Sequence, residues 1–205
     1  MTGVVLAAGA GQRMGRPKLL LPVAGRPLLS WVVDLVERLP LDERVIVLGA
    51  EATAIQGALF PARPEPLPSR EARARASWQV IVNEAWQEGM GSSLRRAAEA
   101  VEGGMLVFLG DMPWVPEQAA REVLARAGEH PVAPAHEGQR GFPVYLPPSL
   151  RPGVLRLSGD RGARDLLANC ELIPWDDPGV VRDVDGMEDL RTPSSVRERI
   201  KRAQA

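Results

Sequence analysis

Short apolar runs alternate along the chain with segments whose apolar residues recur at helical spacing. The run from Gly3 to Ala8 ends at a glycine and is typical of a strand buried on both faces of a sheet. Between Pro27 and Leu39 the apolar residues recur every three or four positions, which predicts an amphipathic helix. A second buried strand is predicted from Arg44 to Leu48. The opening of the chain therefore predicts a βαβ unit.

The same alternation continues to the end of the chain. Further strands are predicted at 78–83, 105–109, 132–135, 142–146 and 171–174, and further helices at 51–60, 116–127, 163–168 and from about 194. Another helix, running to Val101, is expected to begin near Ser92 or Ser93, because serine is a favoured N-cap residue. Residues 61–77 combine four prolines and four arginines with few large apolar side chains, which predicts an exposed insertion.

Strands that alternate with helices predict an α/β fold, in which helices cover both faces of a mostly parallel sheet. Ligands of such sheets bind at the carboxyl ends of the strands, so functional residues are expected just after strands. We expect a single domain over residues 1–205, because 205 residues with 45% apolar content suffice for one large core.

Composition and charge exclude several classes of protein. A net charge of -1 provides no overall basic field, which argues against a nucleic-acid partner. One cysteine, Cys170, and two histidines leave no internal disulfide and no cluster for a structural zinc ion. The opening residues show no basic leader, and their apolar run is far shorter than the ~18 residues of a membrane span. A cytoplasmic protein with no membrane partner is therefore expected.

The loop after the first strand, Gly9 to Lys18, combines glycines with cations. Backbone N–H groups beside glycine can cradle a phosphate, and Arg13 and Lys18 can neutralise charge that develops as pyrophosphate leaves. Lys18 is one of two lysines among 25 basic residues, and a compact ammonium suits a phosphate contact. The loop has neither the ending of a Walker motif nor the glycine spacing of a dinucleotide fold. It predicts a phosphate loop of another kind.

Carboxylates follow two later segments of the chain. Asp111 comes directly after the strand predicted at 105–109, at the edge of the expected ligand crevice. Asp183 and Asp185 lie on the same side of the chain if that segment is extended. Mg²⁺ prefers oxygen ligands and takes only one or two carboxylates. Asp111 together with this second acidic segment is therefore a candidate magnesium site.

These segments resemble the MobA-like NTP transferase group, and within it the molybdenum cofactor cytidylyltransferase branch. The most specific part is the opening LAAGAGQRMGRPK, which matches the family pattern LAAGxGxRMGxxK. Further matching segments follow in the family's order: Asn83 with 89–94, then 110–113, 141–143, 159–164 and 183–185. The resemblance covers nearly the whole chain. It implies a three-layer α/β/α Rossmann-like sandwich of the nucleotide-diphospho-sugar transferase type.

The resemblance also implies the roles of individual residues. The implied nucleotide-binding residues are Leu6, Ala7, Ala8, Gly9, Gly11, Arg13, Lys18, Asn83, Gly91, Ser92, Ser93 and Asp111. Lys18, Arg13 and Asp111 are the implied catalytic residues, and Asp111 and Asp185 match the positions that coordinate Mg²⁺. The phosphorylated acceptor is expected to contact Gly141, Phe142, Pro143, Asp160 and Arg161.

The implied reaction transfers a nucleoside monophosphate to the terminal phosphate of a molybdopterin-type cofactor and releases pyrophosphate. CTP is the expected donor, because Ala8 gives the LAAG form that accompanies cytidine in this family. The resemblance leaves open a molybdenum enzyme as a partner. It also leaves three alternatives: another phosphorylated acceptor, an oxidoreductase of the nicotine-blue type, or a non-catalytic chaperone for the finished cofactor.

Three departures from the family pattern bear on the acceptor. Gly186-Met187 replaces the usual Thr-Pro after the second aspartate, and Phe142 replaces a common histidine. Residues 61–77 lengthen a connection that is usually short. The identity of the acceptor therefore stays open at the level of sequence.

Overall fold

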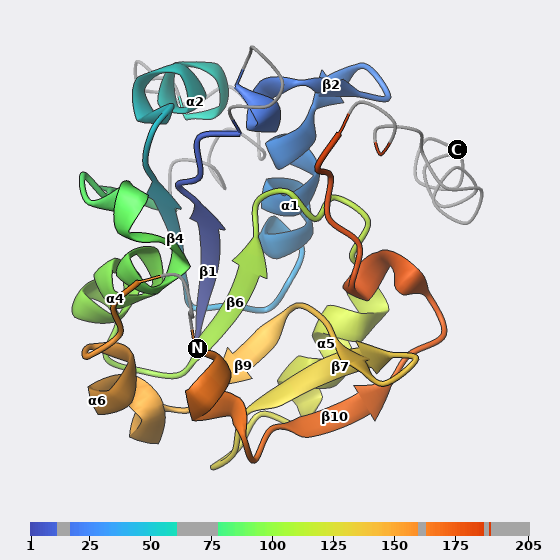
Figure 1. Ribbon diagram of the computed structural model, residues 1–205. Helices are drawn as coiled ribbons and strands as arrows, with labels where there is room; N and C mark the ends of the chain where they lie inside the picture. Colours follow the sequence, from blue (N-terminus) through green and yellow to red (C-terminus); the bar gives the residue numbers. More distant parts are fainter. Residues whose placement is uncertain (12–16, 61–77, 160–162, 187–188, 190–205) are drawn as a thin grey trace.

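The computed structural model describes residues 1–11, 17–60, 78–159, 163–186 and 189 (Figure 1). The insertion predicted at 61–77 and the helix predicted from about residue 194 lie outside these residues. None of the described helices has the length and apolar character needed to cross a membrane.

Most of the described strands form one large mixed sheet (Figure 1). Its strands are β1 (Thr2–Ala7), β4 (Glu43–Leu48), β5 (Trp78–Val82), β6 (Met105–Leu109), β7 (Val132–His136), β9 (Val144–Leu146) and β10 (Glu171–Pro174). They lie in the order β10-β7-β9-β6-β1-β4-β5, and β8 (Gln139–Arg140) pairs with β7. β1 is an interior strand and runs parallel to both β4 and β6, whereas β9 runs antiparallel to β6 and β7. The predicted mostly parallel α/β sheet is confirmed.

The helical elements connect these strands. The α-helices are α1 (Leu28–Glu37), α2 (Ala52–Leu59), α4 (Met90–Ala100), α5 (Glu117–Ala125) and α6 (Arg151–Val154). The 3-10 turns are η2 (Lys18–Leu20), η3 (Trp86–Glu88), η4 (Pro148–Leu150), η5 (Arg164–Leu167) and η6 (Pro178–Val180). A small hairpin of β2 (Pro22–Val23) and β3 (Arg26–Pro27) stands apart from the main sheet.

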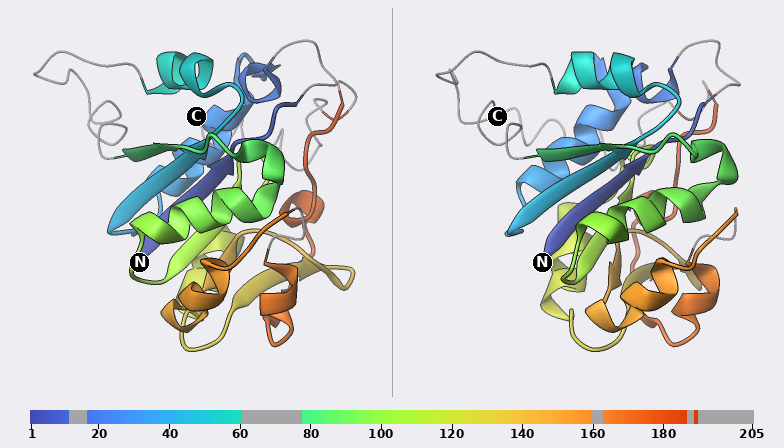
Figure 2. Two further views of the ribbon diagram at one scale, coloured as in Figure 1. Left: turned by 60° about the vertical axis from the view of Figure 1, so that its left-hand side comes forward. Right: turned by 90° about the vertical axis from the view of Figure 1, so that its left-hand side faces the viewer.

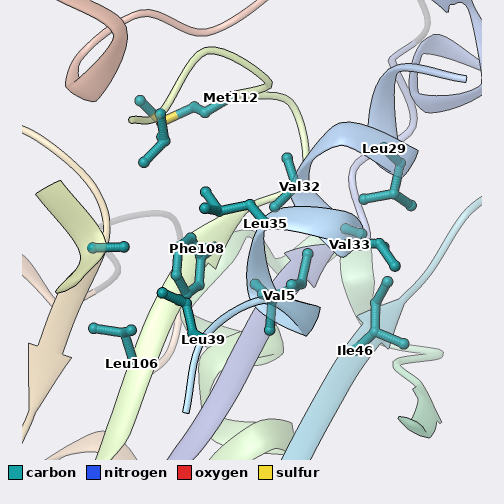
Figure 3. Packing of buried hydrophobic residues seen from close by; sticks show 14 of the residues in the cluster. Val5, Leu29, Val32, Val33, Leu35, Leu39, Ile46, Leu106, Phe108 and Met112 are labelled. Carbon is teal, nitrogen blue, oxygen red and sulfur yellow. The ribbon is translucent and has the colours of Figure 1, made fainter. Parts of the chain in front are cut away.

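One face of the sheet packs against α1. Val5, Ile46 and Phe108 point to this face from adjacent strands and are buried beneath the helix (Figure 3). The side chains that α1 contributes are Leu29, Val32, Val33 and Leu35. Each large apolar side chain buried in this way stabilises the fold by ~1.5–3 kcal/mol.

The opposite face packs against α4, because side chains alternate along a strand. Val4, Val45 and Val107 point to this face, where they meet Leu94 and Ala97. Figure 2 shows α4 and α1 on opposite sides of the sheet. The α/β/α layers expected from the sequence are therefore present.

The start of α4 differs from its prediction at Ser92 or Ser93, which was wrong. The helix begins at Met90, and its N-cap is Gly89 with φ of 100°. Neither serine hydroxyl caps the helix, and both accept hydrogen bonds from the Asn83 amide.

Two elements near the acceptor side also differ. The strand predicted from Phe142 begins at Val144. The Phe142 N–H donates to the Val180 carbonyl instead of a sheet partner, and Pro143 has no N–H to donate. The helix predicted at 163–168 is the short 3-10 turn η5.

Candidate active site

A cavity of about 360 Å³ lies at the carboxyl ends of β1 and β6. This is a volume typical of small-molecule sites, and the position is the one expected for ligands of parallel sheets. Its walls come from three parts of the chain: the first loop, the η3–α4 segment and the end of β6. The lining residues are Leu6, Ala7, Ala8, Gly9, Ala10, Gly11, Lys18, Leu19, Trp86, Gln87, Gly89, Met90, Ser93, Leu109 and Asp111.

Glycines let the backbone close tightly around this cavity. Gly11 has φ of +50°, and a Cβ placed on it would lie 2.5 Å from the Lys18 Cβ. A Cβ on Gly49, at the end of β4, would lie 2.4 Å from the Ala8 carbonyl oxygen. Gly11 thus lets the first loop approach Lys18 closely, and Gly49 lets the chain after β4 approach Ala8.

Lys18 joins two carboxylates at the cavity. Its Nζ lies 2.8 Å from Asp111 Oδ2 and 3.4 Å from Asp185 Oδ1. The side chain of Lys18 is 14% exposed, whereas that of Asp185 is 64% exposed. Burial opposes the charged form of Lys18, but the attraction and hydrogen bonds of Asp111 and Asp185 outweigh it and raise its pKa. The structure therefore brings together three residues that the sequence analysis had assigned separately, Lys18 to the phosphates and the two aspartates to a metal ion.

The segment that carries Asp185 is fixed from both sides. The Val184 N–H donates to the Asp111 carbonyl at 3.0 Å, and the Val184 side chain is fully buried. Asp189 Oδ2 accepts from the N–H groups of Asp185 at 3.0 Å and Gly186 at 2.9 Å, and these bonds lower the pKa of Asp189. The glycine that departs from the family pattern thus sits in a turn closed by a nearby carboxylate.

The charges in this corner favour a cation. The pKa of Asp183 is raised by its partial removal from water and then by the negative charges of Asp185 and Asp111. Lys18 offsets only part of this negative charge. Within the described ranges no group of three or more His, Cys, Asp or Glu side chains could hold a metal ion. Two carboxylates are nevertheless enough for Mg²⁺, and the Lys18 ammonium shows that Asp111 and Asp185 can share one cation.

Asn83 is buried behind the cavity wall, where it organises the start of α4. Its Nδ2 donates to Ser92 Oγ at 2.8 Å and to Ser93 Oγ at 3.0 Å, and its Oδ1 accepts from the Ala85 N–H. Ser92 is also fully buried, so that of these three residues only Ser93 lines the cavity. Direct contact of Asn83 and Ser92 with nucleotide remains a prediction, and in this structure they position the helix.

Replacing Asn83 by alanine is expected to lower the free energy of unfolding by ~2 kcal/mol, because it leaves buried polar groups without partners. Chemical denaturation measures this loss. Asn169 is exposed, so Asn169→Ala is the matched control and should change stability by less than ~0.5 kcal/mol. Equal effects of the two substitutions would contradict a structural role for the Asn83 network.

Gly91 is packed against the chain that leads to the predicted acceptor residues. Its N–H donates to the Gly159 carbonyl at 3.2 Å, and a Cβ at this position would lie 2.7 Å from that oxygen. The helix α4 and the segment before residue 160 are thus in backbone contact.

The remaining predicted residues fall into two groups. Gly141 and Pro143 are buried, and Phe142 is half-buried just before the start of β9. A Cβ on Gly141 would lie 2.2 Å from the Val180 carbonyl oxygen, so this glycine serves a close backbone contact. None of the three lines the cavity described above. Arg13, Asp160 and Arg161 lie outside the described residues.

Several residues that line the cavity were not among the site residues predicted from the sequence. Trp86, Gln87 and Met90 line it from η3 and the start of α4. A signal was available, since these residues stand between Asn83 and Ser92, both of which the family pattern marks. Their side chains give the cavity an aromatic ring, an amide and a thioether opposite the first loop.

Comparison with known proteins agrees with this geometry. Residues 3–174 match the MobA-like NTP transferase domain. The chain is 34% identical to nicotine blue oxidoreductase of Paenarthrobacter nicotinovorans, over 93% of this chain and 94% of that protein. It is 28% identical to the purine catabolism protein PucB of Bacillus subtilis strain 168, over 92% and 93% of the two chains.

Solved structures show the same fold. Rv0371c from Mycobacterium tuberculosis H37Rv matches with a TM-score of 0.76 and 28% identity, over 93% of this chain and 96% of that one. A complex of the same protein with manganese matches with a TM-score of 0.72 and 27% identity, over 93% and 95%. With its glycine loop after the interior strand β1 and a domain match over most of its length, the chain belongs to the MobA-like NTP transferase family.

Proposed function

We propose that this MobA-like nucleotidyltransferase transfers CMP from CTP to the terminal phosphate of a molybdopterin-type cofactor and releases pyrophosphate. Family membership supports the nucleotidyltransferase class. The observation that carries the proposal is the convergence of Lys18, Asp111 and Asp185 at one end of a cavity lined by the glycine loop. That arrangement supplies one flexible cation and two oxygen ligands beside backbone N–H groups.

The chemistry of such a transfer requires no protein nucleophile. An oxygen of the acceptor phosphate attacks the α-phosphorus of the nucleotide, and the bond to the oxygen that bridges the α- and β-phosphates breaks. The electron pair of that bond leaves with pyrophosphate. The protein contributes by positioning the reactants and compensating charge, as in other phosphoryl-type transfers. Lys18 is placed to stabilise the developing negative charge, because its ammonium lies at the cavity edge.

Asp111 and Asp185 are the residues proposed to hold a divalent ion. Such an ion would neutralise charge on the triphosphate and its leaving group. Mg²⁺ is the proposed ion because the available ligands are carboxylate oxygens. The manganese complex of Rv0371c supports a divalent-metal site in a related protein.

The preference for CTP rests on Ala8. Its side chain is 6% exposed and it lines the cavity, and its carbonyl accepts from the Ala50 N–H at 3.2 Å. A glycine here would remove a methyl group from the floor of the cavity. The LAAG form of the motif therefore supports cytosine as the base, by its resemblance to the cytidylyltransferase branch.

A nucleotide and acceptor panel tests the proposal. CTP with Mg²⁺ at a hundredfold excess over its Kd should raise the free energy of unfolding by ~2.7 kcal/mol, and GTP and ATP by less. Pyrophosphate release should then require a molybdopterin-type acceptor, with sugar phosphates and alditol phosphates as comparisons. Release with a sugar phosphate alone would move the assignment to another acceptor. Tight binding without turnover on any acceptor would favour a cofactor chaperone.

A second candidate function is an oxidoreductase, favoured by the 34% identity to nicotine blue oxidoreductase over 93% of this chain. The two functions differ in what they consume. An oxidoreductase would oxidise NADPH in the presence of an electron acceptor and without CTP. The loss of NADPH absorbance measures this reaction. A protein that oxidises NADPH and releases no pyrophosphate would overturn the transferase proposal.

A further inference from the structure

Lys18 occupies the position between the two carboxylates that would bind a metal ion. Both ion pairs that the structure describes for Asp111 and Asp185 run to the same atom, Lys18 Nζ, at 2.8 Å and 3.4 Å. We propose that this ammonium competes with the divalent ion, and that the triphosphate of the nucleotide draws it away, so that metal and nucleotide bind together. This inference rests on the proposed function, and it goes further by specifying how the two ligands are coupled.

Competition follows from charge and space. A divalent ion shared by Asp111 and Asp185 would bind their oxygens at ~2.1 Å, which places it where the ammonium now contacts the same oxygens. Two cations cannot share that space, because they would repel each other at short range with little water between them. The ammonium must therefore leave Asp111 before a metal can take its place.

The side chain of Lys18 can leave while its backbone stays. Its Cβ is held by the close approach of Gly11, and its N–H and carbonyl belong to the turn η2. The four-carbon stem beyond Cβ is flexible, and an ammonium forms its contacts in many directions. Its way out leads along the cavity, which Gly9 and Ala10 line from the first loop.

A triphosphate provides the new partner. Phosphate oxygens lying along the first loop would attract the ammonium and release both carboxylates to the metal at the same time. Coupling of this kind is reciprocal, so each ligand raises the affinity of the other by the same factor. In the absence of triphosphate the protein should bind divalent ions weakly, although it holds two suitable ligands.

Removing the ammonium tests this idea without any nucleotide. Mn²⁺ alone is titrated into the wild-type chain and into Lys18→Met, and free Mn²⁺ is measured by electron paramagnetic resonance. Lys18→Met should bind Mn²⁺ about tenfold more tightly or better. Lys18→Arg keeps a positive charge and should stay near wild type. The double variant Lys18→Met, Asp111→Asn should lose this increase in Mn²⁺ affinity.

Equal Mn²⁺ affinity of wild type and Lys18→Met would overturn the proposal. Circular dichroism checks that each variant is folded, and Lys18→Gln replaces Lys18→Met if the latter is not. Because this measurement uses neither CTP nor an acceptor, its outcome is independent of the proposed transfer reaction. If Lys18→Met binds Mn²⁺ more tightly but the wild-type protein never releases pyrophosphate, the competition between Lys18 and the metal is supported and the proposed function is contradicted.

A second measurement follows Lys18 in the wild-type chain. The chain has two lysines, Lys18 and Lys201, so carbon-13 at lysine Cε gives two signals, which Lys201→Arg assigns. Inorganic triphosphate without metal should shift the Lys18 signal, and saturating Mg²⁺ alone should shift it as well. The Lys18 signal is then read with Mg²⁺ and triphosphate both present. If Mn²⁺ or triphosphate is shown to bind and this signal still does not move, the ammonium does not exchange partners and the proposal fails.

Discussion

Replacing Asp111 by asparagine lowers kcat/KM for nucleotidyl transfer at least a hundredfold, a loss of ~3 kcal/mol in transition-state stabilisation. Asparagine keeps the size of the side chain and one oxygen, but it removes the charge that pairs with Lys18 at 2.8 Å. The proposed metal then has only Asp185 as a charged ligand, and that side chain is 64% exposed. Pyrophosphate release with CTP, Mg²⁺ and the active acceptor measures the loss.

The matched control for this charge removal is Asp42→Asn. Asp42 is 80% exposed and pairs with the amino group of Met1, away from the cavity. The control should keep the wild-type rate, because exposed ion pairs contribute little to stability. A folded Asp111→Asn variant with the rate of Asp42→Asn would exclude Asp111 from the reaction.

Gly49→Ala is expected to lower the free energy of unfolding by ~1–3 kcal/mol, because it adds a methyl group where there is no space. The new Cβ would lie 2.4 Å from the Ala8 carbonyl oxygen and 2.8 Å from the Trp86 Cβ. Ala8 and Trp86 both line the cavity, so relieving this overlap displaces lining residues and changes the shape of the cavity. Nucleotide affinity, measured by calorimetry, should fall together with stability.

Gly57→Ala is the control for this substitution. Gly57 lies within α2, and a Cβ placed on it meets nothing within 4 Å. Alanine is the better helix former, so this variant should gain ~0.5–1 kcal/mol and keep its nucleotide affinity. Loss of stability in Gly57→Ala, or none in Gly49→Ala, would contradict the packing described around β4.

The interior strands were largely predictable because they are buried on both faces. The predicted strand 105–109 agrees with β6 at both ends, and the edge strand β10 also agrees with its prediction at 171–174, although most of its residues are exposed. A continuous apolar run leaves little choice of structure when both sides of a sheet are covered. The helix α1 was predictable for a related reason, since its apolar stripe had to face such a sheet.

Elements set by tertiary contacts were not predictable. The antiparallel direction of β9 is seen in its pairing with β6, and the early start of α4 accompanies the hydrogen bonds of Asn83 to Ser92 and Ser93. The hairpin of β2 and β3 turns through Ala24 and Gly25, both with positive φ, and an alanine in that conformation carries no local signal.

The site was predicted in part. Position after a strand was enough to single out Asp111, and the phosphate-loop pattern was enough for Lys18. The prediction of Asp185 as a metal ligand depended on the family resemblance, because an acidic segment alone does not distinguish a metal site from a solvent-exposed surface. The turn closed by Asp189 and the wall formed by Trp86 came only from the folded chain.

The three groups that meet at the cation position come from widely spaced parts of the chain. Lys18 is 93 residues from Asp111 and 167 residues from Asp185. Chains are synthesised from the N-terminus, so the phosphate loop and the first aspartate leave the ribosome well before the second aspartate does. A nascent chain can thus shape the floor of the cavity early, yet it gains a complete pair of carboxylates only after Asp185 has emerged.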